Sequence, residues 1–140
     1  MVVDIMKEGN LSAKSFIDVG CGVPILPDFM KDLGCKDVHG LEYNASIVKL
    51  VQPHYPDIVL HEGDMMTYQE YGKYDILYTY NPFYDSQKMA DALLVIMEQM
   101  KFGAVLYYNP VRISYQFLEK WGFEELPTDL YGFYKFTKGA

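Results

Sequence analysis

Short apolar runs alternate along the chain with segments whose apolar residues recur every three or four positions. Apolar runs of four to six residues that end at Gly, Pro or Asn predict buried strands, whereas the longer periodic segments predict amphipathic helices. The expected strands cover residues 15–19, 38–42, 58–62, 75–80, 103–108, 123–126 and 132–137. The expected helices cover residues 24–33, 45–52, 86–101 and 113–121.

The most regular of these helices is expected at residues 86–101, with Ser86 as its N-cap. Its apolar residues share one face at spacings of three and four. This face comprises Met89, Leu93, Ile96, Met97 and Met100. A Met-rich face can form a binding groove, but a core-facing surface is the stronger interpretation.

The regular alternation of strands and helices predicts an α/β fold. Right-handed crossovers then give a doubly wound, mainly parallel sheet with helices on both faces. The last two expected strands are close enough in sequence to pair as a hairpin. At 140 residues the chain is expected to form a single domain over 1–140, with 1–14 as a short N-terminal extension before the first strand.

Composition narrows the partners that we expect. The formal net charge of −7 and the 12 Lys and Arg residues give no basic stripe, which argues against nucleic acid as a partner. Cys21 and Cys35 have no metal-ligand spacing and are typical of reduced residues in a cytoplasmic protein. We expect neither a metal nor a membrane span, and the start MVVDIMKEGN lacks the features of a signal peptide. The histidines in the expected strands, His39 and His61, are expected to be packed or hydrogen-bonded.

Polar and glycine residues follow the expected strands and should meet at one edge of the sheet, where doubly wound folds bind ligands. They are Asp18 to Gly22, Glu42 to Asn44, Gly63 to Met65, Asn81 to Tyr84, and Asn109 with Pro110.

The first of these segments lies in the stretch FIDVGCGVP, from Phe16 to Pro24. It has two glycines, Gly20 and Gly22, but no third glycine in the spacing of a dinucleotide turn. Prolines remove amide donors from the following helix, and Asp18 would repel a phosphate. These features suit a ligand with cationic groups, which the glycines allow to approach the backbone closely.

Two further acids follow the next two strands. Glu42 is placed to accept hydrogen bonds from both hydroxyls of a ribose, and Asp64 is placed to accept one from an adenine amino group. Each acid alone is more often a solvated loop residue or a helix cap. Three acids at three successive strand ends favour a shared ligand.

From about Ser15 to the C-terminus the chain resembles the class I S-adenosylmethionine-dependent methyltransferases. FIDVGCG is similar to the first motif of that family, LEY to the second, EGDMM to the third and YDILYTYNPFY to the fourth. LEKWGFEEL and YGFYKF resemble its last helix and final hairpin. The resemblance implies a Rossmann-like, seven-stranded sheet with an antiparallel last strand, and S-adenosyl-L-methionine as cofactor. The cofactor-binding residues that it implies are Asp18, Gly20, Cys21, Gly22, Glu42, Tyr43, Asp64, Met65 and Asn81.

The resemblance also implies methyl transfer by in-line displacement. Asn81-Pro82-Phe83-Tyr84 is similar to the N-P-P-[YF] motif of methyltransferases that act on planar amino groups, although Phe83 replaces its second proline. Asn81 and Tyr84 are the catalytic residues that the motif implies. Tyr78, Tyr80, Tyr107 and Tyr108 also occur in the two central strands, where alternate side chains must face opposite sides. The acceptor is expected to be a small molecule or a protein side chain.

Departures from the family pattern leave alternatives open. Pro24 stands where the family has a third glycine, and only about 14 residues precede the first strand, where many relatives have helices that cover the cofactor. One alternative is a catalytically silent subunit that binds cofactor or a partner chain. Another is a different enzyme on this fold, an aminopropyl transferase or a nucleotide-dependent reductase. Apolar surface left without a cover would favour a homo-oligomer.

Overall fold

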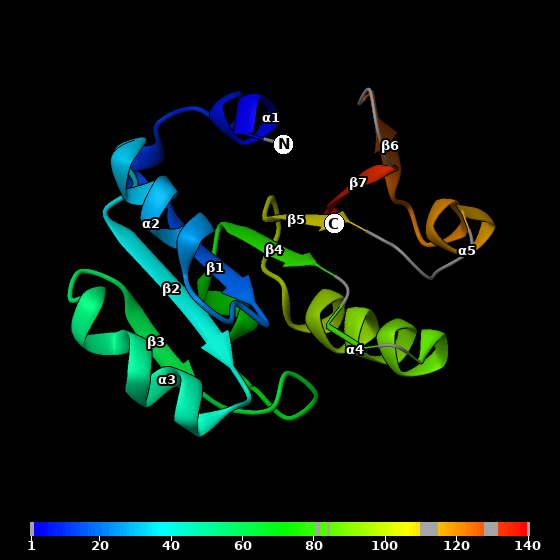
Figure 1. Cartoon of the computed structure of the whole chain (residues 1–140). Helices are drawn as coiled ribbons and strands as arrows, with labels where there is room; N and C mark the ends of the chain where they lie inside the picture. The colour runs from blue at the N-terminus through cyan, green and yellow to red at the C-terminus, as the bar shows by residue number, and fades with distance from the viewer. Residues whose placement is uncertain (1, 81, 84, 110–114, 128–131, 140) are drawn as a thin grey trace.

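A single seven-stranded sheet runs through the molecule in the order β3-β2-β1-β4-β5-β7-β6 (Figure 1). The computed structural model describes residues 2–80, 82–83, 85–109, 115–127 and 132–139. The first five strands are parallel, and β7 runs antiparallel to both of its neighbours, β5 and β6. The strands are β1 Ser15–Val19, β2 Asp37–Glu42, β3 Val59–Glu62, β4 Ile76–Tyr80, β5 Val105–Asn109, β6 Glu124–Leu126 and β7 Phe133–Thr137.

Helices cover both faces of the sheet and bury two separate apolar clusters. The helices are α1 Val2–Met6, α2 Ile25–Asp32, α3 Ala45–Val51, α4 Ser86–Gln99 and α5 Tyr115–Lys120. One cluster joins α1 and α2 to the sheet, and the other joins α4 and α5 to it. Neighbouring strand residues divide between the two clusters, as Tyr107 and Tyr108 do, because side chains alternate along a strand.

The predicted fold class is confirmed, including the doubly wound topology and the antiparallel last strand. The apolar face of α4 is a core face, with Met89, Leu93 and Ile96 fully buried. The expected Ser86 cap is wrong. Asp85 is the N-cap of α4, and its carboxylate accepts hydrogen bonds from the backbone amides of Gln87 and Lys88.

The helix ends also differ slightly from the pattern. The helix expected at 45–52 ends at Val51 and passes into a short 3-10 turn, Gln52–His54. The residues expected to begin the last helix, 113 and 114, lie outside the described residues, and α5 is described from Tyr115. The helix α1 was not predicted, yet it inserts Ile5 into the core, and the Tyr107 hydroxyl donates to the Asp4 carbonyl.

At the amino ends of the central strands, a polar network fastens β1 to the start of β4. The Asp75 carboxylate accepts hydrogen bonds from the amide and hydroxyl of Ser15, at 2.9 and 3.1 Å, and pairs with Lys101 at 2.8 Å. Burial raises the pKa of Asp75, but the Lys101 ammonium and the Ser15 donors outweigh burial and hold the pKa below its ordinary value.

Among the described helices, none has the length and apolar character needed to cross a bilayer.

Candidate functional site

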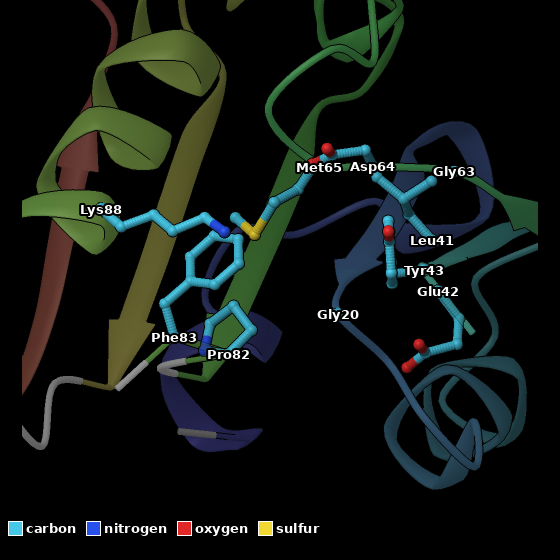
Figure 2. Close-up of a pocket in the computed structure, with 10 residues that line it drawn as sticks. All are labelled: Gly20, Leu41, Glu42, Tyr43, Gly63, Asp64, Met65, Pro82, Phe83 and Lys88. Atoms are coloured by element: carbon cyan, nitrogen blue, oxygen red, sulfur yellow. The ribbon is translucent and has the colours of Figure 1, made fainter. Parts of the chain in front are cut away.

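A cavity of about 470 Å³ opens at the carboxyl ends of the parallel strands (Figure 2). The chain passes outward from β1 to β2 and β3 and then returns to place β4 on the other side of β1. The cavity therefore lies at the topological switch point, where doubly wound sheets bind ligands. Its lining residues come from the ends of four strands and from the first turn of α4: Gly20, Leu41, Glu42, Tyr43, Gly63, Asp64, Met65, Pro82, Phe83 and Lys88.

The loop after β1 is folded tightly by its two glycines. Gly20 and Gly22 have φ angles of +79° and +55°, in the left-handed region that side chains disfavour. A Cβ atom on Gly20 would lie 3.1 Å from Cβ of Pro82. The loop therefore packs closely against the segment after β4, which brings the first and fourth motifs together.

The backbone amides of this loop are already used within the protein. The amides of Gly20 and Cys21 both donate to the Leu41 carbonyl, at 2.8 and 3.0 Å, and the Gly22 amide donates to Glu42 Oε1 at 2.9 Å. These three donors therefore do not point at a ligand anion. This agrees with the sequence argument against a pyrophosphate cradle.

Glu42 links two turns at the edge of the cavity. Its second oxygen, Oε2, accepts from the Asn44 amide at 2.8 Å, while Oε1 holds the loop after β1. The carboxylate is thus fixed in position by one hydrogen bond on each oxygen. Because a carboxylate has about four acceptor sites, both oxygens can still accept a hydroxyl from a ligand.

Asp18 lies behind the loop and is 6% exposed. Within the described part of the chain, no group donates a hydrogen bond to its carboxyl group and no cation pairs with it. Burial, and then the nearby Glu42 carboxylate, raise the pKa of Asp18 to about 7. A cationic ligand group here would relieve both effects, because it would compensate two acidic groups in a poorly solvated site.

The far side of the cavity is formed by the turn after β3. Asp64 lines the cavity, and its Oδ1 accepts from the Met66 amide at 2.8 Å, which leaves Oδ2 available. Met65 is buried, and its carbonyl accepts from the Tyr71 hydroxyl at 2.8 Å. Tyr43 is 76% exposed at the rim. The turn therefore holds the Asp64 carboxylate by Oδ1 and places it beside the apolar Met65 in the cavity lining.

Cys21 is placed differently from the other predicted residues. A Cβ atom on Gly40 would lie 2.7 Å from the Cys21 sulfur, so the thiol packs over the β2 backbone. Burial, and then Asp18, raise the pKa of Cys21 to about 12, so the sulfur stays protonated. Cys21 thus supports the loop through its amide, and its thiol is no nucleophile at neutral pH.

The structure thus brings five of the predicted residues to the lining of one cavity: Gly20, Glu42, Tyr43, Asp64 and Met65. Asp18 lies near the end of β1, and Cys21 and Gly22 lie in the loop that follows β1. Their roles in binding stay predictions. Asn81 and Tyr84, the predicted catalytic residues, lie outside the described residues.

Sequence reasoning missed Lys88 and gave Phe83 no role of its own. Both line the cavity, and the Lys88 ammonium lies 4.4 Å from the centre of the Phe83 ring. The sequence offered one signal for this pair: the aromatic Phe83 precedes the expected helix, and Lys88 follows five positions later in its first turn. The helix start at Ser86 was predicted correctly, but the sequence does not show that the Phe83 ring and the Lys88 ammonium meet.

His39 and His61 lie away from the cavity, on β2 and β3. Their ring nitrogens are 2.9 Å apart, and His39 Nε2 lies 2.6 Å from Asp37 Oδ1. The expectation that these histidines are packed and hydrogen-bonded is confirmed.

Comparisons with known proteins agree with this geometry. No protein-family model matches the chain. A curated N,N-dimethyltransferase for dTDP-3-amino-3,4,6-trideoxy-α-D-glucopyranose from Streptomyces venezuelae is 24% identical over 125 residues, which are 86% of this chain and 52% of that protein. The chain therefore spans about half the length of this curated relative.

Solved structures show the same fold. SAM-bound CalS10, an amino pentose methyltransferase from Micromonospora echinaspora, has a TM-score of 0.66 and 24% identity over 80% of this chain and 49% of its own. An RNA methyltransferase from Salinibacter ruber in complex with S-adenosyl-L-homocysteine has a TM-score of 0.76 and 12% identity, over 99% of this chain and 90% of its own. The chain thus has the fold of the class I S-adenosylmethionine-dependent methyltransferases.

Proposed function

We propose that the protein is an S-adenosylmethionine-dependent methyltransferase that methylates an amino group of a small molecule. The observation that carries the proposal is Asp18, which is buried near the end of β1, two residues before Gly20 of the cavity lining. Among the described residues it has no hydrogen-bond donor and no cation, and the nearest charge that acts on it is the Glu42 carboxylate. This pair of acids suits a ligand that combines cationic groups with a ribose. The curated relative and CalS10 are described as enzymes that methylate amino sugars, which supports an amine acceptor.

The residues around the cavity fit this cofactor in three respects. Asp18 supplies negative charge for the ammonium and sulfonium groups, and the Glu42 oxygens are free to accept the two ribose hydroxyls. Asp64 Oδ2 is free to accept from the adenine amino group.

When bound, the cofactor supplies a sulfonium methyl group that is already activated for displacement by an acceptor nucleophile. The protein mainly positions the acceptor and excludes water. Met65 and Phe83 make one side of the cavity apolar, and Phe83 packs against the core cluster that contains Met65. This apolar side suits an acceptor amine in its neutral, nucleophilic form.

The acidic surroundings favour a small molecule over nucleic acid. Glu42 and Asp64 line the cavity of a chain with a net charge of −7, and a polyanion would be repelled by both. The catalytically silent subunit is not favoured, because Asp18, Glu42 and Asp64 are all present, although Pro24 stands where the family has a third glycine.

The proposal is tested by calorimetric titration with S-adenosylmethionine and S-adenosylhomocysteine, with NADH as the control ligand. We expect micromolar binding of the first two only. Glu42→Gln should weaken both by at least about tenfold, because an amide nitrogen then faces backbone donors and ribose hydroxyls. Glu98→Gln removes the same charge from the exposed surface of α4 and should bind as the wild type does. NADH binding, or equal affinity in Glu42→Gln, would contradict the proposal.

A further inference from the structure

Charge is distributed unevenly around the cavity. The carboxylates of Glu42 and Asp64 line it on the side of β2 and β3, and Lys88 lines it on the side of α4 (Figure 2). Lys88 is the one basic residue among the described lining residues. The two carboxylates that suit the cofactor therefore lie on another side of the cavity than this cation, whose side chain ends beside Phe83 and Met65 (Figure 2).

The Lys88 ammonium is held in position by an aromatic ring. Its nitrogen lies 4.4 Å from the centre of the Phe83 ring, within the range of a cation–π interaction. Phe83 is itself packed against the core cluster of α4 and the sheet. The ring covers one side of the ammonium and leaves other N–H donors free to face the cavity.

The acids nearest to Lys88 on its own helix are engaged with other donors. Asp85 and Asp91 lie three residues before and after Lys88, at positions from which an acid can pair with a helical lysine. Asp85 accepts from the amides at the start of α4, and Asp91 accepts from the Gln87 side chain at 2.9 Å. Among the described residues, no carboxylate forms an ion pair with Lys88.

We propose that Lys88 binds an anionic group, a phosphate or a carboxylate, on the methyl acceptor. This inference rests on the proposed function, since it assigns the side of the cavity away from Glu42 to the acceptor. An ammonium binds either anion as a point charge with several donors. Because the chain as a whole is acidic, this local cation would orient the acceptor with its anionic group toward α4.

The test is an NMR titration of the full chain saturated with S-adenosylhomocysteine. The probes are methyl phosphate and acetate, which separate the two anion types, with methanol as the uncharged control. The signals followed are the Phe83 ring protons and the Lys88 backbone amide. We expect saturable shifts with at least one anion and none with methanol, and we expect the anion affinity to fall as salt is added.

Three variants assign the effect to Lys88. Lys88→Met should weaken the anion at least fivefold without changing S-adenosylhomocysteine affinity, and Lys88→Arg should retain most of the binding. Lys49→Met, on the exposed surface of α3, is the matched control and should behave as the wild type. If Lys88→Met does not fold, Lys88→Gln replaces it.

The outcomes for the two proposals are separable. Equal anion affinity in wild type and Lys88→Met, or no saturable anion binding in the wild type, overturns the anion site while cofactor binding stands. Competition between the anion and S-adenosylhomocysteine also overturns it, because Lys88 would then belong to the cofactor site. If S-adenosylhomocysteine does not bind, the proposed function fails, and the same titration of the free chain still reports whether Lys88 holds an anion.

Discussion

At the two ends of the parallel sheet, two Asp residues are surrounded by groups that shift their pKa values in opposite directions. At the amino ends, Asp75 has a cation and two hydrogen-bond donors, and its pKa is below the ordinary value. At the carboxyl ends, Asp18 is more deeply buried, faces another acid, and has a pKa raised to about 7. The same residue type is therefore a stabilising group at one end and a destabilising charge at the other.

This difference between Asp75 and Asp18 indicates that the amino ends of the strands contribute to stability, whereas the carboxyl ends form a ligand site. A charge with all its partners in the protein contributes to folding and has no need of a ligand. An acid kept without a partner has its charge disfavoured until a suitable cation arrives, which is typical of functional sites. The asymmetry of pKa values along one sheet thus indicates the ligand site without reference to any relative.

The largest effect is expected from Asp18→Asn. The neutral amide no longer attracts the cationic groups of S-adenosylmethionine, so calorimetry should show affinity lowered by at least about tenfold. The folded-state pKa of Asp18 is raised, so its contribution to stability is present at low pH and is lost as pH rises toward 7. Asn carries no charge at any pH and avoids that loss. Without cofactor, the variant should therefore have a free energy of unfolding higher than that of the wild type at pH 8, by an amount on the order of 2 kcal/mol.

Chemical denaturation with and without cofactor checks both parts of this prediction. Asp75→Asn is the matched control, because it makes the same chemical change at the other end of the sheet. A stability gain with unchanged cofactor affinity would remove Asp18 from the cofactor site. A stability loss at pH 8 would show that the Asp18 carboxylate has a stabilising partner.

The pH dependence of binding should follow the Asp18 carboxyl group. A bound cation favours the ionised acid, so binding below pH 7 must release the proton of Asp18. Between pH 6 and pH 8 the affinity for S-adenosylmethionine should rise about tenfold and then level off. Among the groups that interact with Asp18, burial raises the pKa values of Cys21 and Tyr78, so both stay neutral in this range.

Calorimetric titrations at several pH values measure this rise. Ionisation of the ligand also changes the affinity with pH. This effect is the same for Asp18→Asn, so the difference between the two pH profiles gives the contribution of Asp18. Parallel profiles for wild type and variant would mean that the Asp18 carboxyl does not titrate with binding.

The sequence allowed much of the fold to be predicted, because apolar periodicity and Gly or Pro boundaries report directly on strands and helices. It also placed Asp18, Glu42 and Asp64 near one edge, since parallel strands end together. It did not show that Asp18 lacks a partner among the described residues, that Glu42 fixes the loop after β1, or that Lys88 lies over Phe83. The first two features depend on contacts between distant segments, and the third depends on the direction in which the Phe83 side chain points, neither of which local patterns specify.

The smallest effect is expected from Asp75→Asn at the amino ends of the strands. Asn keeps an oxygen that can accept from Ser15 but loses the ion pair with Lys101, whose side chain is 44% exposed. Partly exposed ion pairs contribute little, so we expect a loss of about 0.5–1 kcal/mol in the free energy of unfolding, measured by urea denaturation at pH 7. Affinity for S-adenosylmethionine should be unchanged. Since the pKa of Asp75 is lowered in the folded state, its contribution to stability is present above the ordinary pKa of 3.8, and lowering the pH below that value should reduce the difference between wild type and variant. A weakened cofactor affinity would mean that the two ends of the sheet are coupled, and the separation between stability and ligand binding would then not hold.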